Sequence, residues 1–361
     1  MNKFWAVLSS IFLMSSFICV SAQMRYHDAS QFPVYGKATE MTEKRYERLP
    51  ADLKGRIRDE LWDLGTNSTG LYIKFRSNTS AVTVKWHSTY KNWAPHMADT
   101  GTCGLDLYTQ GKKGWEFIGT AFPSGEKDSE ATLVASLKPE EREFILYLSL
   151  YDEVEDLQIG VDEGAFIENS LTDSPKAGRP IVFYGTSILQ GGCASRPGMA
   201  FSNIIGRKLD REVINLGFSG NGRLDLEIAE VMAGIEDPAI FIMDEAPNCS
   251  GEMIDANGEA FFRILRDAHP DVPVIFIDNP FYAYYGYNEA MTDYFDKSND
   301  AQGRLFRKLK AQGEKKIWYI SGKHTVGTDN EAFVDCIHYT DLGMMRYADF
   351  LIPIIRRHML K

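Results

Sequence analysis

Beyond residue 22 the sequence lacks long apolar runs, an excess of positive charge and any regular cysteine pattern. Without a long apolar run, the remainder of the chain is not expected to cross a membrane as a helix. A net charge of −11, with scattered Lys and Arg, argues against nucleic acid as a partner. There is no phosphate loop, dinucleotide fingerprint or metal-ligand cluster, so we expect no cofactor and no metal.

Four of the five cysteines lie beyond residue 22, at irregular spacings. They form no Cys-x-x-Cys pair and no disulfide framework, which favours small buried thiols. A disulfide between the loops of Cys249 and Cys336 stays open, since sequence gives no distance. The four are Cys103, Cys193, Cys249 and Cys336.

The first residues, "MNKFWAVLSSIFLMSSFICVSAQ", place Lys3 before an apolar run that ends in small residues. This pattern predicts a cleaved secretory signal over residues 1–22 and therefore a periplasmic or extracellular protein. A stable membrane anchor is disfavoured because the run is short and interrupted by serines.

The remaining chain is long enough for two domains, and its two halves differ in periodicity. Residues 23–175 contain short segments in which apolar residues alternate, such as "LYIKFRS" and "AVTVKWHS", with hardly a helical pattern between them. These features predict an all-β sandwich. Residues 176–361 instead alternate apolar runs with helix-period segments, which predicts a parallel, doubly wound α/β domain.

Polar groups follow the apolar runs of this second domain. Ser187 follows "IVFYG", "GFSGNG" (217–222) follows the second run, and Asn248 follows the third. Near the carboxyl terminus, "VDCIHYTDLG" places Asp335 and His338 just before a predicted helix. In an open α/β sheet the carboxyl ends of the strands form the ligand-binding edge, so we expect these groups to converge there.

The chemistry of serine hydrolysis needs such a set. Ser187 is the candidate nucleophile, His338 the base that accepts its proton, and Asp335 the carboxylate that orients the imidazole. The backbone N–H groups of Ser187 and Gly220 and the side-chain amide of Asn248 are candidate donors to an oxyanion. His324 is the rival base, but it brings no carboxylate at a matching spacing.

These four blocks, in this order, resemble the SGNH hydrolases, also called GDSL esterases. The resemblance covers residues 180–361 and implies a flavodoxin-like three-layer α/β/α domain that hydrolyses esters through an acyl-serine. Upstream, "GLDLYTQG" is similar to the motif of a β-rich, jelly-roll-like domain that precedes certain SGNH esterases of glycan-degrading bacteria. Together the two matches imply a two-domain carbohydrate esterase.

The chain departs from the family pattern at two positions. Thr186 stands where the family commonly has Asp, and Cys249 stands where an acid often follows the asparagine. Both departures concern the positioning of Ser187 and Asn248. A related subgroup orients the histidine with a backbone carbonyl instead of an aspartate, so this alternative to Asp335 stays open.

The resemblance implies removal of short acyl groups, most of all acetyl, from a glycan. Trp93, in a long insert over residues 87–104, and three tyrosines after the fourth run are candidate sugar contacts, since aromatic rings suit sugar faces. Two alternatives stay open: a lipase or thioesterase acting on longer acyl chains, and an inactive glycan-binding protein. Sequence does not give the oligomeric state. The tyrosines are Tyr282, Tyr284 and Tyr285.

Overall fold

The computed structural model describes residues 23–92 and 94–360. The predicted signal over residues 1–22 and the side chain of Trp93 lie outside this part. No helix within the described residues is both long and apolar enough to span a bilayer.

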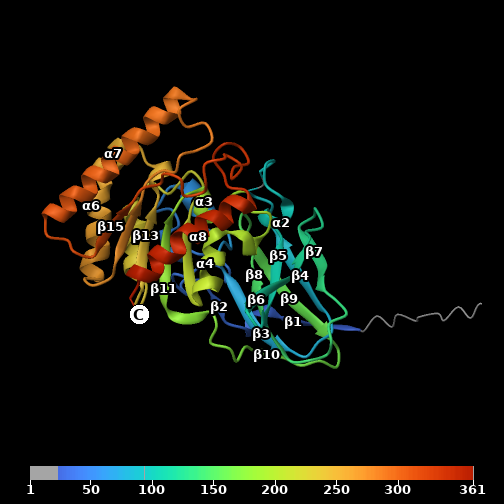
Figure 1. Cartoon of the computed structure of the whole chain (residues 1–361). Helices are drawn as coiled ribbons and strands as arrows, with labels where there is room; N and C mark the ends of the chain where they lie inside the picture. Colours follow the sequence, from blue (N-terminus) through green and yellow to red (C-terminus); the bar gives the residue numbers. More distant parts are fainter. Residues whose placement is uncertain (1–22, 93, 361) are drawn as a thin grey trace, which may run out of the picture.

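Two antiparallel sheets form the amino-terminal half (Figure 1). Their facing side chains, among them Phe75, Trp86 and Phe144, make one buried core. The hairpin of β5 (Leu105–Gly111) and β6 (Gly114–Ala121) closes between Gly111 and Gly114. In strand order, one sheet consists of β1 (Met24–Asp28), β9 (Val154–Asp162), β4 (Val82–Ser88) and β7 (Asp128–Val134), and the other of β10 (Ile167–Asn169), β3 (Tyr72–Ser77), β8 (Arg142–Tyr147), β5 (Leu105–Gly111) and β6 (Gly114–Ala121), with β2 (Val34–Tyr35) paired to β3.

The carboxyl-terminal half contains a five-stranded parallel sheet. Numbered within this half, its strands run in the order 2-1-3-4-5, which is the flavodoxin-like order predicted from the resemblance. In space the strands are β12 (Arg211–Gly217), β11 (Lys176–Gly185), β13 (Ile240–Asp244), β14 (Val274–Ile277) and β15 (Ile317–Ile320).

Helices cover both faces of this sheet, and the side chains of β11 explain why. Ile181 and Phe183 pack on one face, and Val182 and Tyr184 on the other, so the whole apolar run is buried. Helices α4 (Phe201–Leu209) and α8 (Asp341–His358) cover the first face. The second face is covered by α5 (Leu226–Ala233), α6 (Gly251–Ala268) and α7 (Glu289–Ala311).

The predicted insert after β4 is irregular except for α2 (Asp99–Thr102), and it reaches the α/β domain. Thr100 donates a hydrogen bond to the carbonyl of Ser195 at 2.6 Å. The apolar run that continues β8 also leaves its sheet: the amides of Leu150 and Tyr151 bond to residues of α2. These segments bring the β domain to the edge where the parallel strands end.

Candidate active site

The chain turns sharply at the carboxyl end of β11 and begins the short helix α3 (Ser187–Gln190). Thr186 caps this helix, because its hydroxyl accepts the amide hydrogen of Ile188 at 3.3 Å. Ser187 is the first helical residue and is 7% exposed. The threonine that replaces the family's aspartate therefore still holds the turn that carries the serine.

The loop before α8 presents His338 to this serine. Its Nε2 lies 2.8 Å from Ser187 Oγ, and its Nδ1 lies 2.7 Å from Asp335 Oδ2. The second carboxylate oxygen accepts the backbone N–H groups of Ile337 and His338. Partial burial opposes ionisation of Asp335, but the hydrogen bonds from His338 outweigh it and lower the pKa of the carboxyl to about 2. The aspartate is therefore a fixed anion behind the imidazole.

Two further loops close the other side of the serine. Gly220 follows β12 with a φ of +66°, a conformation that favours glycine. Asn248 ends a short 3₁₀ turn after β13, and its Oδ1 accepts the amide hydrogen of Gly222 at 3.4 Å. Cys249 donates its thiol hydrogen to the Gly222 carbonyl at 3.3 Å, so this cysteine ties the two loops together.

These loops enclose a pocket of about 270 Å³ in front of Ser187. Ser187, Gly220, Asn248 and His338 line it together with apolar side chains. The apolar lining includes Ile188, Pro247, Tyr282, Met291, Phe295 and Ile337. The groups that sequence placed in four separate loops thus share one cavity.

The predicted aromatic contacts are placed differently from one another. Tyr282 lines the pocket but is only 2% exposed and packs on Phe295, with ring centroids 4.6 Å apart. Tyr284 stacks beside Tyr282, and Tyr285 stacks on Phe281 outside the pocket lining. Trp93 lies outside the described residues, but His96 from the same insert places its Nε2 3.7 Å from Asp335 Oδ2.

The rival base and the cysteines can also be placed. His324 is exposed and lies against Phe281 rather than Ser187. The four cysteines of the described chain are free thiols, and Cys336 is the exposed one among them.

Several residues that support the site were not identified from sequence. The hydroxyl of Tyr151, from the β domain, donates to the Ser187 carbonyl at 3.1 Å. Gln190 Oε1 accepts a hydrogen bond from the amide of Ser219, and Gln190 Nε2 donates one to Asn67 Oδ1 at 3.0 Å. These contacts hold the backbone around the nucleophile, and a single polar side chain gives no sequence signal for such a role.

Arg48 is a further buried support, at 1% exposure. Its guanidinium donates to four backbone carbonyls, those of Leu64 and Asn67 in its own domain and of Asn215 and Gly217 at the end of β12. Burial lowers its pKa to about 9. The arginine thus joins the β domain to the strand that precedes the Gly220 loop.

The motif "GLDLYTQG" also has a structural role. Asp106 is fully buried, and its Oδ2 accepts hydrogen bonds from Arg196 at 2.7 Å and from the amide of Gly198 at 2.8 Å. Arg207 lies 4.1 Å from the ring centroid of Tyr108. The motif therefore holds the loop that follows α3, on the far side of the nucleophile turn.

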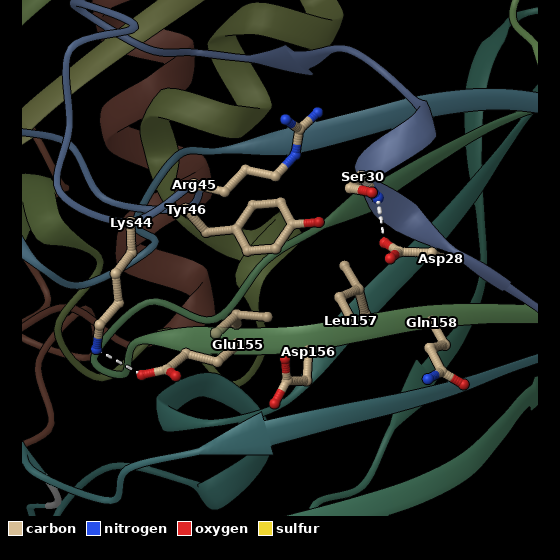
Figure 2. A pocket seen from close by; sticks show the side chains of 10 residues that line it. Asp28, Ser30, Lys44, Arg45, Tyr46, Glu155, Asp156, Leu157 and Gln158 are labelled. Atoms are coloured by element: carbon tan, nitrogen blue, oxygen red, sulfur yellow. Dashed lines mark hydrogen bonds and ion pairs between the residues drawn. The ribbon is translucent and has the colours of Figure 1, made fainter.

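A larger pocket, of about 540 Å³, lies in the β domain (Figure 2). Lys44 and Glu155 form an ion pair of 2.7 Å at one end of it. Its lining contains neither Ser187 nor a histidine, so size alone does not locate the chemistry.

Both halves of the chain match models of known protein families. The model of the GDSL-like lipase/acylhydrolase family matches residues 178–356, and the GxDLY model, of the N-terminus of SGNH hydrolase-type esterases, matches residues 24–167. A search of curated proteins gave no match.

Among solved structures, a protein from Bacteroides ovatus ATCC 8483 described as a GDSL-like lipase is 33% identical, with a TM-score of 0.89 over 94% of this chain and 99% of its own. The salicylyl-acyltransferase SsfX3 of a tetracycline biosynthetic pathway is 16% identical, with a TM-score of 0.73 over 93% and 96% of the two chains. The acetyl xylan esterase Est2A of the rumen bacterium Butyrivibrio proteoclasticus is 12% identical, with a TM-score of 0.58 over 92% and 98%. The last two share the fold.

Proposed function

The chain belongs to the GDSL-like lipase/acylhydrolase family and is a serine ester hydrolase, and we propose that it removes short acyl groups, above all acetyl, from carbohydrate. The observation that carries the mechanism is the chain of hydrogen bonds from Ser187 through His338 to Asp335 at the pocket.

In this mechanism Ser187 Oγ attacks the ester carbonyl while His338 Nε2 accepts the hydroxyl proton. The carbonyl oxygen becomes an oxyanion, and the N–H groups of Ser187 and Gly220 face it. Asn248 lines the pocket and its Oδ1 accepts from Gly222, which supports its amide nitrogen as a third donor. His338 then returns the proton to the departing sugar oxygen, which leaves an acyl-serine.

Hydrolysis of the acyl-serine repeats the same steps with water. His338 takes a proton from the water, whose oxygen attacks the acyl carbon, and Ser187 recovers its proton as the acid departs. Asp335 stabilises the imidazolium in both halves of the reaction without being protonated itself.

The size of the pocket supports a short acyl group. Pockets for drug-sized ligands have volumes of about 300–1,000 Å³, whereas the pocket at Ser187 has about 270 Å³. It has to hold the acyl group and the first part of the alcohol, and a short acyl group leaves room for both. The shared fold with an acetyl xylan esterase supports acetyl and carbohydrate. The signal-like pattern over residues 1–22 supports an exported enzyme.

The test compares hydrolysis of p-nitrophenyl acetate and octanoate, and acetate release from acetylated xylan, by the wild-type protein and by Ser187→Ala. We expect faster turnover of the acetate ester, release of acetate from the polymer, and loss of both in the variant. Preference for octanoate would instead favour a lipase or thioesterase. Negligible rates on all three substrates would contradict the proposal and favour a binding role.

A further inference from the structure

Three side chains that can bind a metal ion meet beside the candidate triad. They are His96 of the β-domain insert, Cys193 of the loop after α3, and His338 itself. One ligand atom from each lies within 4.8 Å of those of the other two. The sequence predicts no metal site, because these residues lie far apart along the chain. The fold of the α/β domain brings Cys193 to His338, and the contact between the domains adds His96.

The loop that carries Cys193 is held close to His338. Gly192 donates its amide hydrogen to the Ser187 carbonyl at 2.8 Å, and a Cβ at Gly192 would lie 3.1 Å from His338 Cδ2. Further along, Ser195 donates its amide hydrogen to Asp341 at 2.9 Å, at the start of α8. The thiol of Cys193 is therefore a buried group with a fixed position beside the imidazole.

His96 completes the cluster from the other domain. Its ring centroid lies 5.4 Å from that of His338, and its side chain is 40% exposed, which gives it room to turn inward. A tetrahedral zinc ion with bond lengths of about 2.0–2.3 Å needs ligand atoms about 3.3–3.8 Å apart. Since the three atoms already lie within 4.8 Å of one another, side-chain movements of about 1 Å bring them to that separation.

We propose that His96, Cys193 and His338 form a binding site for Zn²⁺ or a similar thiophilic divalent cation, and that metal binding there inhibits the esterase reversibly. Two imidazoles and one thiolate are ligands that such ions prefer, and the fourth position stays open to water. Binding replaces the S–H bond of Cys193 with an S–metal bond and releases one proton to solvent. The Asp335 carboxylate, 3.7 Å from His96, adds a negative charge next to the ion.

Inhibition follows from the hydrogen bonds of His338. Both of its ring nitrogens are engaged, Nε2 with Ser187 and Nδ1 with Asp335. An ion bound to either nitrogen must therefore break one of these two bonds. The inhibitory effect rests on the proposed function, whereas the binding site itself does not.

The first experiment measures hydrolysis of p-nitrophenyl acetate during titration with Zn²⁺, each variant being normalised to its own metal-free rate. We expect half-inhibition to need at least about 10-fold more Zn²⁺ in His96→Gln and in Cys193→Ser, and a chelator to restore activity. His87→Gln and Cys336→Ser are matched controls that remove a histidine of the same domain and an exposed cysteine near the site, and both should keep wild-type sensitivity. Equal sensitivity in all five proteins, or activity that requires the metal, would overturn the proposal.

The second experiment uses Co²⁺ and the Ser187→Ala variant, so that it needs no turnover. We expect a thiolate-to-cobalt charge-transfer absorption in the near ultraviolet that disappears when Cys193→Ser is added and persists when Cys336→Ser is added. Absence of this absorption from Ser187→Ala would overturn the metal site, even if the wild-type protein hydrolyses esters. Its presence in a protein whose wild type hydrolyses no ester would leave the site standing and contradict the proposed function instead.

Discussion

The α/β domain and the β domain bring different kinds of group to the surroundings of Ser187. The α/β domain contributes polar side chains that line the pocket, namely Ser187, His338 and Asn248. The β domain contributes Arg48 and Tyr151, which donate hydrogen bonds to backbone carbonyls behind the pocket. One domain therefore supplies chemistry, and the other holds the backbone in the conformation that the chemistry needs.

This contrast predicts two different mutational phenotypes. Changes on the α/β side should lower kcat while the protein stays folded. Changes at the β-domain contacts should lower stability first, because they remove partners from buried polar groups. His96 is the exception, a β-domain side chain that lies beside Asp335.

The largest expected effect comes from the base. His338→Ala removes the group that accepts the serine proton, so kcat for p-nitrophenyl acetate should fall by about 10⁴- to 10⁶-fold. Circular dichroism should show an unchanged fold. His324→Ala, which removes the exposed histidine away from Ser187, should leave kcat unchanged. A comparable loss in both variants would remove the distinction between the two histidines.

Arg48→Met tests the β-domain side. The substitution takes the donors from four buried carbonyls and should lower the free energy of unfolding by about 3–5 kcal/mol. Thermal unfolding should show a fall in Tm of roughly 5–15 °C. Arg56→Met is the control, since Arg56 makes an exposed ion pair with Asp52 at 2.8 Å and such pairs contribute little. Equal Tm values for the two variants would show that the buried arginine does not hold the domains together.

Asn248→Ala should lower kcat by about 10²- to 10³-fold, because it removes one of three oxyanion donors. KM for p-nitrophenyl acetate should change little, since the donor acts mainly in the transition state. Asn330→Ala changes an exposed asparagine outside the pocket and serves as the control. A rise in KM at unchanged kcat would assign Asn248 to substrate binding instead.

The smallest effect concerns buried acids beneath the site. Burial raises the pKa of Asp244, which accepts a hydrogen bond from Tyr347 at 2.9 Å, to about 7, and raises that of Glu245 to about 8. Both acids therefore contribute to the free energy of unfolding through their raised folded-state pKa values. This contribution is fully present below about pH 4 and is lost as the pH rises to about 8.

Asp244→Asn should therefore raise Tm at pH 8 more than at pH 5, since the amide never has to ionise. Thermal unfolding at the two pH values measures this difference directly. The same substitution would contradict the assignment if it lowered Tm equally at both.

The sequence predicted the α/β-domain part of the site better than the β-domain part. The convergence of Ser187 and Asn248 was predictable because parallel strands deliver their carboxyl ends to one edge. His338 was predictable from its spacing to Asp335 just before the last helix. The role of Arg48 was not predictable, because its partners are backbone carbonyls, and these do not depend on which side chain a residue carries. The β-sandwich was also predictable from alternation, but its approach to Ser187 through Tyr151 was not, since the apolar run of β8 gives no sign that it leaves the sheet.

The aromatic contacts show a further limit. Clustering of tyrosines after β14 indicated a surface for sugars, yet Tyr282 is packed into the core beside Phe295. Sequence composition does not distinguish a ring that faces solvent from one that a neighbouring helix covers.

The measurement that tests the central claim most directly is covalent labelling with a fluorophosphonate, followed by mass spectrometry of the digested protein. We predict one adduct per molecule, on the peptide that contains Ser187, forming quickly in the wild type and far more slowly in His338→Ala. An adduct on another residue, or equal labelling rates in the two proteins, would contradict a serine nucleophile activated by His338.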